Sequence, residues 1–406
     1  MTTNYTIFSV LGLEIEYMLV DRGTLNVQPK SDLILKQLAG ERACEVSLGD
    51  IAISNELVMH VLELKNNGPK HVSAPVAAQF QQAILQLQPI LEAHHLQLLP
   101  TAAHPWMDPL TETHRWPFGN REVYEKYDAI FDCRGHGWAN LQSMHMNLPF
   151  SNDDEFTQLH NTIRLILPLL PALAASSPFL DGKPTGLLDS RLFFYGKNQQ
   201  RIPSITGDVT LEFIQSPAEY HDKILAPMYR DIKPFDTAGI LQHEWLNSRG
   251  AIAKFDISAI EIRMLDSQEC VNADLAIAHA IHAILHQWHA QSRLHLEEPC
   301  DGARLKAIYD CSIKDGFNTR IDDTVVLNQW QLPKRNMSAR DVWSFLIERV
   351  SADLTQTSQQ ALEHLLRHGN LSERILRACQ NVYDRATIER VYRQLGDCLL
   401  TNQMLG

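Results

Sequence analysis

Pairs of polar side chains interrupt strands that are otherwise apolar, and their types and spacing suggest chemistry. The stretch LGLEIEYMLV, residues 11–20, carries Glu14 and Glu16 two positions apart. Because side chains alternate between the faces of a strand, Leu13 and Ile15 share one face and both glutamates share the other. Neighbouring carboxylates repel each other. The pattern therefore predicts either a wet strand face or a cation bound between the glutamates.

Two later segments repeat this pattern. In NLQSMHMNLPF, residues 140–150, His145 and Asn147 share a strand face, and in SAIEIRML, residues 258–265, Glu261 and Arg263 do. One such pair is common, because antiparallel sheets often face water on one side. Three pairs built from glutamate, histidine, asparagine and arginine favour a functional face over a merely solvated one.

Glu56 and Glu63 stand seven residues apart in SNELVMHVLELKNN, residues 54–67. This spacing does not preserve a strand face, so a bend or bulge must lie between the two if they converge. Surface charges are the alternative interpretation, since glutamate is rarely buried unpaired. On one concave sheet these acids would form an acidic cup that needs cations. Its six members would be Glu14, Glu16, Glu56, Glu63, His145 and Glu261.

The donor types of this acidic cup predict which metal it would bind. Carboxylate oxygens with one imidazole suit Mg²⁺ or Mn²⁺ better than zinc. Since Mg²⁺ usually bridges carboxylates to substrate phosphates, the cup indicates a nucleotide enzyme. DGKPTG, residues 181–186, lacks the earlier glycine of a P-loop, and RGHGWAN, residues 134–140, precedes a strand instead of following one. Metals and arginines would therefore hold the phosphates.

Taken in order, these motifs resemble the glutamate–cysteine ligase family, the carboxylate–amine ligases of the glutamine synthetase-like superfamily. GLEIEY resembles the family's Gly-x-Glu-x-Glu strand, Glu56 with Glu63 its pair of acids, and SMHMNLPF its His-x-Asn strand. SSPFLDGKPTGLLDSR, residues 176–191, and AIEIRMLD, residues 259–266, resemble two further family segments. The resemblance runs from about residue 10 to 268, and the region from about residue 300 onward is less diagnostic.

The resemblance implies an α+β fold, with a curved antiparallel β-sheet funnel flanked by helices and a helical C-terminal part. It implies an ATP-dependent ligase that forms an amide through an acyl phosphate, most naturally γ-glutamylcysteine for glutathione biosynthesis. Three alternatives stay open: another amine acceptor, a metal-dependent hydrolase that uses the same cup, and a non-catalytic relative. The last is disfavoured because all six positions of the acidic cup are present.

The resemblance also assigns roles to residues. Arg263 and Glu63 would be catalytic, and Arg263 would contact the ATP phosphates. Arg134, in the loop DCRGHGW, is a second candidate for ATP, with a plain turn as the alternative. Arg191 and Asn147 would bind substrate, Arg191 by a bidentate fork to a carboxylate. The metal ligands, for Mg²⁺ or Mn²⁺, would be Glu14, Glu16, Glu56, Glu63, His145 and Glu261.

The sequence shows no internal repeat, low-complexity linker or clear domain boundary, which predicts one domain, residues 1–406, with its core in 5–300 and a helical region in 301–406. The resemblance implies that this domain is catalytic. We expect strands in 7–20, 54–65, 140–150 and 259–265, and irregular structure in 176–240, with short strands. We expect loops in 101–137, a helix from about Ala74, one capped by Asn152, one after Asp274, and helices from Ala339 onward.

Composition limits the partners. The formal net charge of −12 argues against a nucleic-acid surface, although a metal-bound nucleotide is compatible with it. Seven scattered cysteines and the absence of a signal-like start or a long apolar run predict a cytoplasmic protein with reduced thiols and no membrane contact. Small-molecule substrates (glutamate, an amine such as cysteine, and ATP) are the expected partners, and a homo-oligomer is left open.

Two further groups of side chains attract attention. Four histidines form a stripe if their segment is helical, and we interpret the stripe as a polar helix edge or a subunit contact rather than a metal site: His279, His282, His286 and His289. Four aromatic residues could line the amine pocket, but core packing is the favoured interpretation: Trp106, Trp116, Phe118 and Tyr124.

Overall fold

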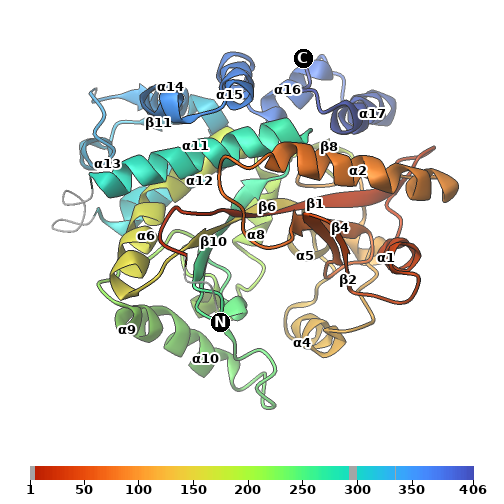
Figure 1. Cartoon of the computed structure of the whole chain (residues 1–406), viewed down its shortest axis with the longest axis horizontal. Coiled ribbons are helices and arrows are strands. Elements are labelled where there is room, and N and C mark those ends of the chain that lie inside the picture. Colours follow the sequence, from red (N-terminus) through yellow and green to blue (C-terminus); the bar gives the residue numbers. More distant parts are fainter. Residues whose placement is uncertain (1–4, 292–299, 334) are drawn as a thin grey trace.

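The computed structural model describes residues 5–291, 300–333 and 335–406. Its centre is an antiparallel eight-stranded sheet in the order β2-β3-β4-β1-β6-β10-β9, with β5 also paired to β1 (Figure 1). The strands are β1 (Gly12–Asp21), β2 (Glu45–Leu48), β3 (Ile51–Asn55), β4 (Val61–Asn66), β5 (Leu96–Leu99), β6 (Ser143–Pro149), β9 (Ala251–Lys254) and β10 (Ala259–Asp266).

The apolar face of the sheet packs on two long helices. Leu13, Ile15 and Tyr17 of β1 are fully or almost fully buried in the main hydrophobic core, together with apolar residues of α2 (Val76–Ala93) and α11 (Val271–Ala290). Both helices run along the same side of the sheet in Figure 1. Burying this face leaves the opposite face, with Glu14 and Glu16, to form a site.

Four C-terminal helices form an outer layer beyond α2 and α11 (Figure 1). They are α14 (Ala339–Val350), α15 (Gln356–His368), α16 (Leu371–Ala378) and α17 (Arg385–Thr401). Helix α15 packs against α11, and α17 packs against α2 and β5. The predicted α+β class, the antiparallel sheet flanked by helices and the helical C-terminal part are confirmed.

Shorter elements complete the chain. The helices are α1 (Ser31–Ala39), α3 (Pro109–Glu112), α4 (Arg121–Phe131), α5 (His136–Ala139), α6 (Asp153–Ile166), α7 (Leu170–Ala174), α8 (Ser190–Tyr195), α9 (Pro217–Tyr220), α10 (Ala226–Ile232), α12 (Gly302–Asp315) and α13 (Thr324–Gln329). Two small ladders pair β7 (Phe179–Leu180) with β8 (Lys183–Pro184), and β11 (Arg320–Ile321) with β12 (Met337–Ser338). Within the described residues, no helix has the length and apolar character needed to cross a membrane.

Several expected elements are confirmed and two are corrected. Asn152 caps α6, because its side chain accepts a hydrogen bond from the Glu155 backbone at 3.0 Å. The expected loop of residues 101–137 contains helix α4, whose buried side is narrow and consists of Tyr127 and Ile130. The expected irregular segment 176–240 holds short helices (α8 to α10) in addition to the short strands β7 and β8. Ser216, which caps α9, and Pro217 were the available helix signals.

Candidate active site

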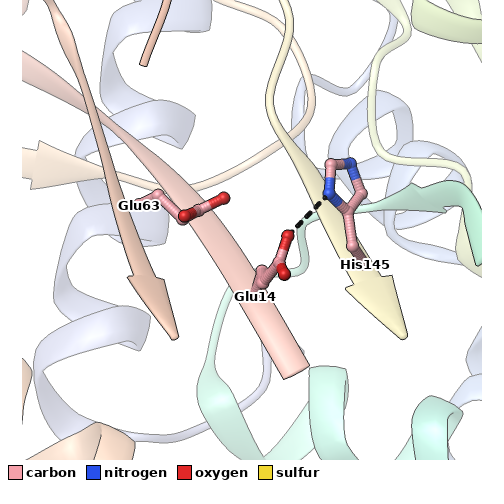
Figure 2. Close-up of side chains that lie close together, drawn as sticks. All are labelled: Glu14, Glu63 and His145. Carbon is pink, nitrogen blue, oxygen red and sulfur yellow. Dashed lines mark hydrogen bonds and ion pairs between the residues drawn. The ribbon is translucent and has the colours of Figure 1, made fainter. Parts of the chain in front are cut away.

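Strand β1 brings the predicted acids together, because it lies between β4 and β6. Glu14 stands opposite Lys65 of β4 and His145 of β6, and Glu16 stands opposite Glu63 of β4. Residues that oppose each other in an antiparallel pair share a face, so these side chains project to the same side. Figure 2 shows Glu63, Glu14 and His145 side by side on three adjacent strands.

Hydrogen bonds orient Glu14 within this face. His145 Nδ1 lies 3.2 Å from Glu14 Oε2, and Asn147 Nδ2 donates to Glu14 Oε1 at 3.1 Å. Gly12 stands opposite Asn147, and a Cβ atom at residue 12 would lie only 3.1 Å from the Asn147 Cβ. The absence of a side chain at Gly12 therefore leaves room for Asn147, which orients Glu14.

The connection between β3 and β4 places Glu56 close to Glu63 in space. Strand β3 ends at Asn55 and β4 begins at Val61, so the bend that the seven-residue spacing requires is a strand-to-strand connection. Glu16, Glu56 and Glu63 offer ligand atoms within 4.8 Å of one another. Glu14, Glu63 and His145 do the same, so Glu63 belongs to both groups.

Glu261 closes the acidic cup from β10. Its side chain is 1% exposed, and its Oε1 lies 2.9 Å from Arg263 Nε and 3.9 Å from His145 Nδ1. Lys254 of β9 forms a second ion pair with this carboxylate. The structure thus brings together all six predicted acidic and imidazole residues, and Arg263 lines the same cavity.

Burial and mutual repulsion change the acidity of the cup. Burial raises the pKa of Glu56 to about 8, with the charges of Glu16 and Glu14 adding to it. Burial raises the pKa of Glu63 to about 8 as well, helped by Glu14 and Glu56, and it raises the pKa of Glu16. Protons or cations must compensate these carboxylates, as expected where acidic side chains are gathered to hold a cation.

The pKa of Glu14 shifts in the opposite direction. Burial alone would raise the pKa of Glu14, but the hydrogen bond from His145 and the positive charges of His145, Lys254 and Lys65 lower it below the usual range. Burial disfavours the charged form of His145, yet its bond to Glu14 and the charge of Glu261 raise the pKa of this imidazole. Glu14 therefore stays ionised more readily than Glu16, Glu56 and Glu63.

Arg191, at the start of α8, presents a guanidinium group to the same cavity. Its Nε donates to Asp266 Oδ1 at 2.5 Å, and its Nη1 donates to the backbone oxygen of Arg263 at 3.3 Å. Asp266 is held in turn by the Ser176 backbone at 2.8 Å and the Ser177 hydroxyl at 3.1 Å. The buried Nη2 has no hydrogen-bond partner within the described part of the chain. One guanidinium donor thus remains available for an anion.

These groups line a cavity of about 550 Å³. Aromatic side chains from α4, α5, α8 and the turn Glu244–Leu246 contribute to the lining: Tyr124, Tyr127, Trp138, Tyr195 and Trp245. Tyr124 lines the cavity and is also partly buried against the hydrophobic core, whereas Trp116 is buried in that core. Trp106 and Phe118 are partly buried against hydrophobic clusters. A cavity of this volume is typical of a small-molecule binding site.

Other sequence candidates lie elsewhere. Arg134 is exposed, and its Nε donates to Asp132 Oδ1 at 2.8 Å. It is outside the cavity lining, so the geometry gives its predicted ATP contact no support. Asn147 reaches the cavity through Glu14 rather than as a lining residue.

The histidine stripe packs against other parts of the chain. His282, His286 and His289 surround the ring of Phe8, and His279 Nδ1 lies 3.0 Å from the hydroxyl of Ser358. This arrangement agrees with the predicted polar helix edge.

Sequence reasoning missed two lysines of the cavity, Lys65 and Lys254. Lys65 Nζ lies 3.2 Å from Glu63 Oε1, and Lys254 pairs with Glu261. Lys65 follows Glu63 by two residues and therefore had to share its strand face. Lys254 ends the short strand AIAK, a segment for which the sequence analysis predicted no element.

Known protein sequences resemble this chain over much of its length. A family model described as Glutamate-cysteine ligase family 2 matches residues 10–394. An uncharacterised protein of Archaeoglobus fulgidus is 37% identical over 276 residues, which cover 68% of this chain and 74% of that protein. The "Putative glutamate–cysteine ligase 2" of Leifsonia xyli is 26% identical over 199 residues, and the match spans about half of either chain, 48% of each.

Solved structures share the fold. The glutamate–cysteine ligase of Francisella tularensis, solved in complex with AMP, superposes with a TM-score of 0.64 at 14% identity, over 98% of this chain and 90% of that one. A bifunctional glutathione synthetase of Pasteurella multocida gives a TM-score of 0.53 at 10% identity, over 96% and 53%.

The family match, together with the antiparallel sheet and its acidic cavity, supports a carboxylate–amine ligase. More particularly, the chain belongs to Glutamate-cysteine ligase family 2, whose model matches almost its whole length.

Proposed function

We propose that this protein is an ATP- and Mg²⁺-dependent ligase that joins the γ-carboxylate of glutamate to an amine. Cysteine is the acceptor to which the family name points, and Mn²⁺ is an alternative metal. The observation that supports the proposal best is the acidic cup itself, in which two groups of ligand atoms share Glu63. Two adjoining cation sites suit a reaction that gathers phosphate and carboxylate oxygens in one place.

The residues fit such cations. Oxygen donors with one imidazole match the ligand preference of Mg²⁺ and Mn²⁺, and the raised pKa values of Glu56 and Glu63 show an excess of negative charge that cations would relieve. When bound, the metals would neutralise the ATP phosphates. Holding them would be the task of Glu14, Glu16, Glu56, Glu63, His145 and Glu261.

The basic side chains would bind and orient the substrates. In the proposed reaction the glutamate γ-carboxylate attacks the γ-phosphorus and ADP leaves, and the amine then attacks the acyl carbon and phosphate leaves. Arg263, fixed by Glu261, would stabilise negative charge on the phosphoryl group as it transfers. Arg191 would hold a substrate carboxylate through its unpartnered Nη2.

ADP release provides the test. Metal-stripped protein receives ATP, Mg²⁺ and glutamate with a panel of amines that includes cysteine, and we expect ADP only when both glutamate and one amine are present. Glu14→Gln should reduce the rate about 100-fold or more, because it removes a ligand. Glu92→Gln, which alters a surface ion pair with Arg22, is the matched control.

Two other results would change the conclusion. Activity with another amine but not with cysteine would leave the ligase standing and replace the acceptor. Cleavage of phosphoesters with metal alone, together with no amine-dependent turnover of ATP, would show that the cup belongs to a hydrolase.

A further inference from the structure

Two lysines hold carboxylates of the acidic cup in ion pairs. Lys65 Nζ lies 3.2 Å from Glu63 Oε1, and Lys254 Nζ contacts Glu261 Oε2. Both side chains line the cavity, and they are only 29% and 27% exposed. Their ammonium groups therefore occupy oxygens of two carboxylates that the proposed function assigns to metal ions.

We propose that Lys65 and Lys254 are internal counter-cations that compete with the metal ions, and that Lys254 contacts the ATP phosphates once it is displaced. This inference rests on the proposed function. A divalent cation and an ammonium group repel each other at one carboxylate, and the repulsion is strong in a partly buried site. Metal binding must therefore move both ammonium groups away from Glu63 and Glu261.

The two lysines differ in where their ammonium groups can go. Lys65 already has a second partner outside the cup, because its Nζ also lies 2.9 Å from Oε2 of Glu45, a half-exposed residue on β2. A metal on Glu63 leaves Lys65 paired with Glu45. Lys65 would thus be a positioning residue that links β4 to β2.

Lys254 lies on the opposite side of the cup, on β9. Its ion-pair partner in the described structure is Glu261, which Arg263 also binds at 2.9 Å. If a metal takes Glu261, the ammonium group of Lys254 faces the cavity, where phosphate oxygens would be the nearest new anions. Lys254 is therefore the lysine expected to bind the nucleotide.

Metal and ATP binding separate these roles. Lys254→Met, Lys65→Met and wild type are titrated with Mn²⁺ in the absence of ATP, and then with ATP at saturating Mn²⁺, by calorimetry. Both methionine variants should bind Mn²⁺ about fivefold more tightly, because a competing ion pair is gone. Only Lys254→Met should bind ATP about tenfold more weakly, because it loses a charged contact.

Controls distinguish charge from folding. Lys70→Met breaks an ion pair with Asp50 outside the cavity, at 2.6 Å and with a similar lysine exposure of 23%, and it should change neither affinity. Lys254→Arg keeps the charge and should keep ATP affinity near that of wild type. Thermal melting of each variant checks that it folds.

The possible failures are distinguishable. If Lys254→Met binds Mn²⁺ and ATP as wild type does, or if Lys254→Arg loses ATP affinity as severely as Lys254→Met, this inference is wrong, while amine-dependent ADP release by wild type still supports the ligase. If wild type binds neither Mn²⁺ nor ATP, the proposed function fails, and the inference fails with it.

Discussion

At the scale of single residues, Glu63 is the carboxylate that joins the two groups of candidate metal ligands in the acidic cup. It contributes to both groups of candidate metal ligands, accepts a hydrogen bond from Ser54 Oγ at 2.9 Å and pairs with Lys65. Glu56 lies at the edge of the cup and contributes to one group. The two residues share a raised pKa but differ in how much of the site depends on them.

Metal affinity should rise with pH. Burial and neighbouring carboxylates raise the pKa values of Glu56 and Glu63 to about 8, so below pH 8 this coupled pair takes up protons that a metal ion must displace. Below that pH the Mn²⁺ affinity should increase about tenfold per pH unit for each proton released, and it should level off above it. Calorimetric titrations between pH 6 and pH 9 measure this slope. In Glu56→Gln, metal binding should release one proton fewer, so the slope should be smaller. An unchanged slope would contradict the assignment of Glu56 as a metal ligand.

Arg191 should determine the affinity for a carboxylate substrate. Arg191→Lys keeps a positive charge but loses the guanidinium group, which binds Asp266 through Nε and leaves Nη2 for a ligand in the cavity. The KM for glutamate should therefore rise about tenfold or more, and the KM for ATP should change little. Steady-state kinetics measure both values. Arg134→Met, in an exposed ion pair with Asp132, serves as the comparison and should leave both values unchanged. A rise in the KM for ATP in Arg134→Met would restore the role predicted from the sequence.

At the scale of strands and helices, local patterns predicted most of what surrounds the site. Alternation predicted which faces of β1, β6 and β10 carry Glu14, His145 and Glu261, because a strand repeats every two residues. The register between strands was not predictable. For example, the pairing of β10 with β6 shifts between Ile262 and Leu265, and only tertiary packing determines such an irregularity.

Contacts between distant segments account for the rest of the site. Arg191 reaches the cavity because Asp266, 75 residues later, holds its guanidinium group. Lys254 enters the site because β9 pairs with β10, and a four-residue strand leaves little periodicity to detect. Helix α4 was missed because its charged sequence, REVYEKYDAIF, buries only two residues, Tyr127 and Ile130.

Gly12 provides a test of how β1 and β6 position Glu14. In Gly12→Val the new side chain would meet Asn147, whose Cβ lies only 3.1 Å from the place that a Cβ at residue 12 would take, so the strands must separate locally. We expect a loss of about 1–3 kcal/mol in the free energy of unfolding, as in overpacked cores, and weaker Mn²⁺ binding. Denaturant unfolding and calorimetry measure the two effects. Gly135→Ala, with open space around its added Cβ, should change neither.

At the scale of the whole molecule, buried neutral histidines should make the fold sensitive to acid. Burial lowers the pKa of His60 to about 4, of His104 to about 3, and of His160 and His282 to about 4. His60 precedes β4 and His104 follows β5, whereas His160 lies within α6 and His282 within α11. Protonating any of them would place an uncompensated charge in the interior.

The direction of this pH dependence follows from the difference in histidine pKa between the folded and unfolded chain. The unfolded chain takes up these protons near pH 6.5, whereas the folded protein resists until about pH 4 or below, so stability is fully present above pH 6.5 and falls as the pH decreases. At pH 5 each histidine should cost about 2 kcal/mol. Melting temperatures between pH 7 and pH 4.5 measure the decline. His104→Gln, which removes one titrating group, should make it shallower, and an identical decline would contradict this account.

The central position of β1 also bears on how the chain folds. Its neighbours in the sheet come from later segments, including β6 some 130 residues on, and β10 follows beyond that. Such distant pairings form slowly, because the intervening loops must close first. We therefore expect the glutamates of β1 to meet Glu63 of the nearer β4 before they meet His145 of β6. A cation held only by Glu16, Glu56 and Glu63 needs no more than the pairing of β1 with β4, whereas one that also needs His145 has no complete ligand set until β6 has joined the sheet.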